Sequence, residues 1–289
     1  MKKVLSLIVG VVLLCTASAS AFASGKWEFT VLGGYGLGAH DDSSHYGRTW
    51  SLQFLDPVEE TTAIAFSQKS SAAFSASGAF FWSSHFGIQL GLGYFGPKTS
   101  AASDWNLTWH WTDTNETFTE QGALPSAGGR LRSIPIFLNF AARYTVGPVE
   151  ILVTGGPALY LNSIEADSFG LYSDSQFNTY WWGWEQTLDA FTIPLVLDKK
   201  WTSLGFNAGL GVSVPISRGL AVSAEARYFA CPAKSLNWTW TQGSYNGLFG
   251  EISGYSFGGA SAAIAGPATT ALSVNPSFAA IMGGLSYRF

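Results

Sequence analysis

The chain is poor in both cysteine and charge. Its 289 residues include two cysteines, Cys15 and Cys231, and only 12% of them are Asp, Glu, Lys or Arg. Soluble domains usually carry about 25% charged residues, so an ordinary water-exposed surface is excluded. Cys15 falls in an apolar N-terminal run that we expect to be removed, which leaves Cys231 without a partner. The fold must therefore be stable without an internal disulfide.

The chain also lacks a hydrophobic run long enough for a transmembrane helix, which needs about 20 predominantly apolar residues. Two lysines open the chain, the shorter apolar stretch "VLSLIVGVVLL" follows, and "AFA" at residues 21–23 supplies the small residues at which a signal peptidase cuts. This is the pattern of a secretory signal peptide. We therefore predict a signal peptide over residues 1–23 and one domain over residues 24–289.

Basic residues are few and are not clustered. The 15 Lys and Arg, less the two of the leader, leave 13 against 19 Asp and Glu, so the mature net charge is about −6. Nucleic-acid-binding proteins carry basic patches, so no nucleic acid is expected as a partner. We also expect no cofactor and no metal, because the polar cluster of His40, Asp41, Asp42 and His45 is better explained by a solvated loop.

The abundant feature is alternation of apolar residues with small or polar ones. Of the residues, 47% are hydrophobic and 15% aromatic, and 33 are glycine. In "FGIQLGLGYF", Ile88 and Leu90 share one side while Gln89 and Gly91 share the other, a period of two that predicts a β-strand. The pattern recurs in eight segments: residues 26–37, 71–82, 86–95, 133–144, 149–161, 203–216, 220–229 and 278–289.

The connections between these segments alternate between long and very short. The long ones are residues 38–69, 97–130, 163–201 and 231–275, and the short ones are residues 83–85, 145–148 and 217–219. Loops above about 15 residues are unusual in compact soluble domains, but outer-membrane barrels combine short periplasmic turns with long external loops. We predict an all-β fold: an eight-stranded antiparallel up-and-down transmembrane β-barrel with four long extracellular loops.

Six charged residues are predicted to face the interior of this barrel. They are Glu28, Arg143, Glu150, Glu225, Arg227 and Arg288. Three acids balance three bases, and a buried charge without a partner would cost several kcal/mol, so we predict an ion-pair network across the lumen. An eight-stranded barrel is just wide enough to be filled by side chains. We therefore favour a structural plug over a gate that opens when partners exchange.

Aromatic residues gather in the long connections. The predicted external aromatic surface comprises Trp105, Trp109, Trp111, Tyr180, Trp181, Trp182, Trp184, Trp238 and Trp240. Such rings either form an interfacial girdle in contact with lipid and lipopolysaccharide, or act as anchors for an external ligand such as a glycan or a host protein.

Catalysis is the weakest of the functional hypotheses. An acid–base pair of His110 and Asp113 with the segment His40–Asp42 would need their loops to meet, and no serine is placed to act as a nucleophile with either. We therefore predict no catalytic residues and no enzymatic activity.

The chain closes on "GLSYRF", with Gly284, Tyr287 and Phe289 at a characteristic spacing. With the leader and the eight strands, this ending resembles the small outer-membrane barrels of the OmpA-type transmembrane domain, OmpX and opacity-like families. The resemblance implies that these three residues are the assembly signal read by the barrel-assembly machinery. It also implies location in the outer membrane of a Gram-negative-type cell.

The function expected from the sequence is that of a bacterial outer-membrane barrel with a largely plugged lumen. Its role would be structural or would lie in surface interaction, by adhesion or ligand binding through the aromatic external loops. The alternative is a narrow porin or a conduit for small or apolar molecules, and an outer-membrane hydrolase ranks below both. The expected partners are outer-membrane lipid and lipopolysaccharide, the assembly machinery, and a host or glycan ligand.

Overall fold

The computed structural model describes residues 26–38, 42–52, 55–111, 115–180, 183–240, 246–247 and 271–289. The predicted signal peptide lies outside these residues. Among the described residues, no helix has the length and apolar character needed to cross a membrane.

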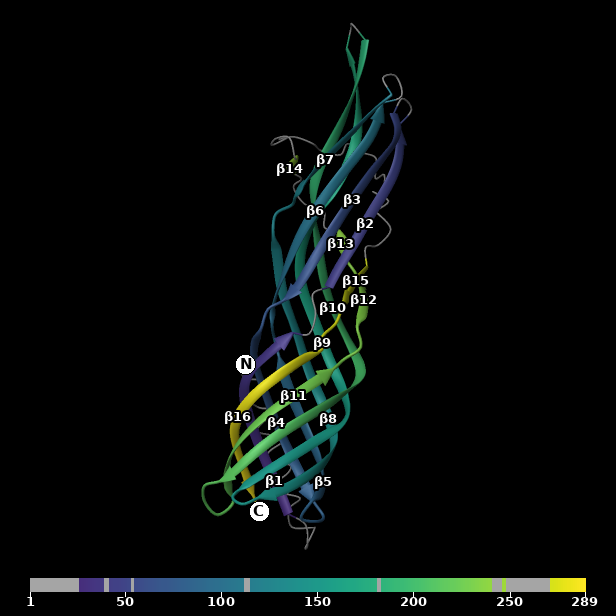
Figure 1. Ribbon diagram of the computed structural model, residues 1–289. Helices are drawn as coiled ribbons and strands as arrows, with labels where there is room; N and C mark the ends of the chain where they lie inside the picture. The colour runs from purple at the N-terminus through teal and green to yellow at the C-terminus, as the bar shows by residue number, and fades with distance from the viewer. Residues whose placement is uncertain are drawn as a thin grey trace.

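Eight strands close into a ring (Figure 1). They are β1 (Lys26–Gly38), β4 (Ser71–Phe81), β5 (Phe86–Phe95), β8 (Ala127–Val146), β9 (Val149–Tyr180), β10 (Gly183–Pro215), β11 (Leu220–Ala230) and β16 (Phe278–Arg288). Each strand pairs antiparallel with the next in this order, and β16 pairs back with β1. Closure gives every strand of the ring two neighbours, as a lipid environment requires. The predicted fold is confirmed.

The long connections are built largely of further strands. They contain β2 (Asp42–Leu52), β3 (Leu55–Gln68), β6 (Lys98–Trp111), β7 (Glu116–Ala123), β12 (Lys234–Asn237), β13 (Thr239–Trp240), β14 (Asn246–Gly247) and β15 (Ala271–Val274). β3 pairs with β2 and β6, β6 also pairs with β7 and β8, and β9 and β10 continue as one hairpin. The barrel therefore extends well beyond the ring, toward the top of Figure 1.

The two faces of the ring follow the predicted alternation. Apolar side chains such as Val31, Leu90 and Phe206 point outward and are 54%, 57% and 68% exposed. Their neighbours Gln89 and Asn207 point inward and are buried. The outer face is thus an apolar belt suited to lipid, and the inner face carries the polar residues.

Above the polar residues, an aromatic layer fills the lumen. The aromatic layer consists of Phe95, Phe137, Phe229 and Phe278, all at most 1% exposed. The ring of Phe278 stacks on Phe95 and on Phe229, with 4.5 Å between centroids in each case. A Cβ on Gly91 would lie 2.5 Å from the Phe137 ring, so this ring can pack against the wall only because residue 91 has no side chain.

Beyond the aromatic layer, the extended strands enclose a second apolar cluster, here called the upper core. It comprises Ile64, Phe66, Ala101, Leu131, Ile164, Ala166, Leu195, Leu197, Leu236, Trp238, Leu272 and Val274. These residues come from the ring strands β8 and β9 and β10, from β3 and β6, and from the segment around the small β12–β15 sheet. The part of the barrel outside the membrane belt is therefore filled like the interior of a water-soluble β protein.

Candidate functional site

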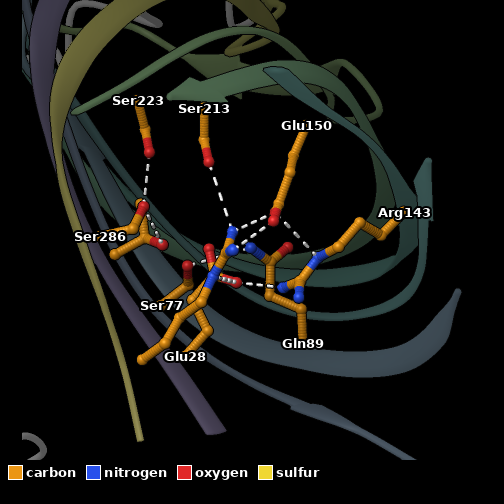
Figure 2. Close-up of polar contacts among 10 residues, drawn as sticks. Glu28, Ser77, Gln89, Arg143, Glu150, Ser213, Ser223 and Ser286 are labelled. Atoms are coloured by element: carbon orange, nitrogen blue, oxygen red, sulfur yellow. Dashed lines mark hydrogen bonds and ion pairs between the residues drawn. The ribbon is translucent and has the colours of Figure 1, made fainter. Parts of the chain in front are cut away.

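Four of the six inward charges meet at the end of the barrel that carries the short turns (Figure 2). Glu28 of β1 accepts from the guanidinium of Arg143 on β8 and from Nε of Arg288 on β16, the latter at 3.0 Å. Arg288 also binds both carboxylate oxygens of Glu150 on β9, with Nη1 at 2.5 Å from Oε1. Nε of Arg143 lies 3.5 Å from Oε2 of Glu150. Two acids and two bases thus alternate around a closed ring of contacts.

Strand register explains why these side chains meet. Glu28 and Arg288 are directly opposite each other across the β1–β16 seam. On the other side of the lumen, β8 and β9 are joined by a tight turn, and Thr145 pairs with Glu150. This places Arg143, two residues earlier on the same face, next to Glu150. The seam and the turn therefore each deliver one acid and one base to the same level of the lumen.

Glu225 and Arg227 form a second group deeper in the barrel. They lie two residues apart on β11, so their side chains point to the same face, and they form an ion pair. Arg227 is 3% exposed and donates to the side-chain oxygens of Asn207 at 2.9 Å, Gln89 at 3.1 Å and Thr154 at 3.1 Å. Its guanidinium carbon lies 4.4 Å from the centroid of Phe137. Arg227 thereby joins the polar residues to the aromatic layer.

Neutral amides complete the polar layer, the name used here for the six inward charges together with Gln89, Asn139 and Asn207. Nδ2 of Asn139 donates to Oδ1 of Asn207 at 3.0 Å, and Nδ2 of Asn207 returns a bond to Oδ1 of Asn139 at 2.8 Å. Asn139 also donates to Gln89. Gln89 in turn donates to Ser77, and both residues are labelled in Figure 2. Alternation places these amides inside the barrel, but a search for charged residues overlooks them. They can be recognised in the sequence as Asn or Gln at inward-facing positions of strands whose other inward-facing residues are mostly small.

Little space remains among these side chains. The cavity that they line, bounded by Glu28, Gln89, Arg143, Glu150 and Arg288 among others, has a volume of about 20 Å³. About 10–15 Å³ is the minimum for one water molecule. In this arrangement, the polar layer therefore leaves room for about one water rather than for a hydrated ion.

The three residues of the predicted assembly signal, Gly284, Tyr287 and Phe289, lie on the seam that closes the barrel. A Cβ on Gly284 would stand 2.0 Å from the backbone oxygen of Val31, so the seam needs glycine at this position. Tyr287 and Phe289 are 46% and 59% exposed on the outer face. Their rings contact each other at 4.9 Å, and the Phe289 backbone nitrogen donates to the carbonyl of Trp27 at 3.0 Å.

The structure places the predicted external aromatic residues in different environments. Trp109 stacks on Phe118 across the β6–β7 hairpin, with centroids 5.7 Å apart, and the Trp105 ring lies against Gly122. Trp238 does not belong to an external surface: it is 3% exposed and packs in the upper core. This correction follows from the extension of the barrel, which gives the β12–β13 region an inner face. Of the others, Trp111, Tyr180, Trp184 and Trp240 lie in β6, β9, β10 and β13, and Trp181 and Trp182 are outside the described residues.

The histidine pairs considered for chemistry are only partly described. Nδ1 of His110 lies 3.0 Å from Oγ1 of Thr117 on β7. Asp113, His40 and Asp41 are outside the described residues. Among the residues that are described, no group of three His, Cys, Asp or Glu side chains is arranged to hold a metal ion.

The whole barrel matches one family model, described as outer membrane protein beta-barrel domain, over residues 9–289. The chain belongs to this family. Its location is accordingly the outer membrane, as predicted from the terminal signal and the strand pattern. No curated protein is similar to the chain in sequence at a significant level.

This chain is similar in fold to several solved outer-membrane barrels, although the sequence identities are low. OprG from Pseudomonas aeruginosa is 12% identical, with a TM-score of 0.41 over 91% of this chain and 95% of that one. OmpT, an outer membrane protease from Escherichia coli, is 9% identical, with a TM-score of 0.38 over 93% and 98%. Ail, the attachment invasion locus protein of Yersinia pestis, solved with the heparin analogue sucrose octasulfate, is 8% identical, with a TM-score of 0.33 over 91% and 99%.

Proposed function

We propose that this outer-membrane barrel is a structural and surface-interaction protein whose lumen is plugged, and that it is neither a diffusion pore nor an enzyme. The observation that carries the proposal is the cavity of about 20 Å³ within the polar layer, which is directly covered by the stacked rings of the aromatic layer. A solute entering from the short-turn end meets the polar layer first, and one entering from the outer end meets the aromatic layer once it has passed the upper core.

The two barriers resist opening for different reasons. Separating the ion pairs of Glu28, Glu150, Arg143 and Arg288 would leave partly buried charges without partners, at a cost of about 3–5 kcal/mol for each broken pair. Displacing Phe278 would lose its stacking on both Phe95 and Phe229 and would open a void in a close-packed layer. Spontaneous opening of both at once is therefore rare.

Planar-bilayer conductance of the purified protein tests the plug. We expect no discrete current steps for the wild type or for Glu150→Gln, because the aromatic layer closes the lumen even when one ion pair is lost. Arg218→Gln, an exposed substitution in the short turn before β11, is the matched control. Discrete channels in the wild type that are lost or enlarged by Glu150→Gln or Arg227→Gln would instead favour a gated pore.

A second part of the proposal concerns the external strands. The stacked pair of Trp109 and Phe118 is partly exposed, with Phe118 at 40%, on the hairpin formed by β6 and β7. Flat exposed ring pairs suit the apolar face of a sugar or a protein side chain. If this surface binds a glycan or a host protein, cells carrying Trp109→Ala with Phe118→Ala should lose attachment to a glycan array or host-cell layer. Cells carrying Trp238→Phe, a change in the upper core, should retain attachment.

Processing and assembly belong to the same proposal. Removal of residues 1–23 predicts a mature N-terminus near Ser24, which N-terminal sequencing of the membrane-extracted protein would reveal. Retention of Lys2 and Lys3 in that protein would contradict it. Turnover of a lipid or peptide substrate that disappears in His110→Ala would contradict the non-enzymatic assignment.

A further inference from the structure

Arg132, Ser163 and Lys200 form a row on the outer wall of the barrel. Arg132 of β8 is opposite Ser163 of β9, and Ser163 is opposite Lys200 of β10. Arg132 and Lys200 are exposed on the outward-facing side of their strands. Neighbouring strands are about 4.8 Å apart, so the two cationic stems are about 10 Å apart with a hydroxyl between them. Their side chains are long enough to meet over that hydroxyl.

The row stands at the outer edge of the apolar belt. The next outward-facing residues toward the short turns are Ile134 on β8, Leu161 on β9 and Thr202 on β10. Leu204 comes after Thr202, and Leu161 and Leu204 are 42% and 75% exposed. Ser163 lies 13 residues along β9 from Glu150. At about 3.3 Å per residue and a tilt of about 40°, this is a height of about 33 Å, which is about 8 Å beyond the ~25 Å apolar band of outer-membrane barrels. The row therefore lies at the depth of lipid headgroups in the outer leaflet.

The positive charge of this row is not balanced within the row itself. The next row outward contains Lys98, Arg130, Glu165 and Asp198, each opposite the next on β6, β8, β9 and β10. Its two cations and two anions cancel, and Asp167 adds a further acid above them. This outer row borders a hollow of about 550 Å³. From the belt outward, the wall thus changes from apolar to basic and then to mixed charge.

We propose that Arg132, Ser163 and Lys200 bind a phosphate group of an outer-leaflet glycolipid headgroup. The guanidinium and the ammonium pair with the phosphate oxygens, and the Ser163 hydroxyl donates a hydrogen bond to the same group. The acyl chains lie along Leu161 and Leu204, and the hollow above accepts the sugar that carries the phosphate. A free phosphate ion would use only the row, whereas the lipid also uses the apolar wall below it.

Native mass spectrometry of the mature full-length protein in detergent, titrated with hexa-acylated lipid A that carries two phosphates, tests this site. Each basic residue near a membrane surface typically strengthens binding of an anionic lipid about fivefold. We expect Arg132→Gln and Lys200→Gln each to weaken lipid A binding about fivefold, and the double variant about 25-fold. The charge-preserving pair Arg132→Lys and Lys200→Arg should stay within about twofold of the wild type. Arg218→Gln, which removes a charge at the opposite end, should have no effect.

Two further ligands separate lipid from phosphate. Lipid A without its phosphates should bind at least tenfold more weakly than the bisphosphorylated form, and inorganic phosphate should not compete at millimolar concentration. Equal binding by the double variant, equal binding of dephosphorylated lipid A, or full competition by inorganic phosphate would overturn the proposal. Heat-modifiable mobility in gels confirms that each variant is a folded barrel before it is titrated.

Discussion

The lower lumen, which is lined by the six inward charges and their amide partners, and the upper core share the strands β8, β9 and β10 but are filled by opposite chemistry. Each guanidinium nitrogen of Arg227 donates to a side-chain oxygen, and the acceptors are Gln89, Thr154, Asn207 and Glu225. In the upper core, Ile164, Leu197 and Leu272 are completely buried among other aliphatic residues. The lower lumen lies within the apolar belt, and the upper core lies beyond it.

The difference shows which property specifies each region. Hydrogen bonds and ion pairs are directional, so the lower lumen requires one strand register, whereas apolar packing depends mainly on volume and tolerates substitution. Most of the buried polar side-chain atoms that lack a hydrogen-bond partner among the described residues lie at or above the aromatic layer, including Ser133 Oγ, Asn162 Oδ1 and the indole nitrogens of Trp201 and Trp238. The indole nitrogen of Trp27, at the short-turn end, is the exception.

The largest effect on the contrast between the lower lumen and the upper core is expected from deleting Phe289, the residue that follows the closing strand β16. Deletion of Phe289 removes its bond to Trp27 and its edge contact with Phe29, at 5.7 Å between centroids. It also removes the terminal aromatic of the proposed assembly signal. We expect a several-fold loss of folded barrel in membranes, measured by heat-modifiable mobility. Shortening the β2–β3 hairpin, which lies outside the ring, should reduce the yield less, and equal yields for the two variants would contradict the prediction.

A smaller but specific effect is expected from Arg227→Met. Methionine fills a similar volume but leaves Glu225 buried at 7% exposure without its cation, so the free energy of unfolding should fall by about 3–5 kcal/mol. Urea titration of the protein in lipid vesicles measures this change. The second variant, Glu225→Gln with Arg227→Met, removes the isolated charge and should recover part of the loss. No recovery would mean that the amide contacts of Arg227, and not its charge, stabilise the lower lumen.

The upper core should respond to lost volume and not to lost charge. Leu197→Ala removes a side chain with no exposed surface and should cost about 2–5 kcal/mol, as cavity-forming substitutions do. Because this core lies beyond the membrane belt, the loss should appear as faster hydrogen exchange in β3 and in the outer part of β9, with the part of the ring below the aromatic layer unchanged. Leu197→Met should be almost neutral. Equal protection of the upper strands in Leu197→Ala and the wild type would show that the upper core does not depend on close packing.

The ring could be predicted from the sequence because lipid and lumen impose opposite chemistry on neighbouring residues. In β5, Ile88 and Leu90 had to face outward and Gln89 inward, whichever strands lay beside them. The same rule identified Glu28, Arg143, Glu150 and Arg288 as inward residues, and a short turn and a seam then brought them together. The eight strand segments agree with the structure for the same reason.

Alternation in "WNLTWHWT" and "LNWTWT" predicts strands beyond the bilayer, but the core that they enclose and the partners within the lumen could not be predicted in this way. Trp238 looks like an exposed loop residue because alternation in "LNWTW" does not indicate whether the opposite face is water or protein. Only the pairing of β12 with β15 encloses it. The amide pair of Asn139 and Asn207 depends on two strands that are 68 residues apart in the chain, and no local pattern contains that contact.

The hairpin of β9 and β10 has a mechanical consequence. Its 31 consecutive residue pairs run from Glu150 opposite Ser213 to Tyr180 opposite Gly183, a length of about 100 Å at about 3.3 Å per residue. A pull on its outer tip moves both strands in the same direction and loads their hydrogen bonds to the neighbouring strands β8 and β11 in shear, so that many bonds share the force. The tension arrives at Glu150, whose carboxylate is bound to Arg288 on the closing strand. A ligand bound at the outer end of the β9–β10 hairpin is therefore connected, through one continuous pair of strands, to the β1–β16 seam on the opposite side of the membrane.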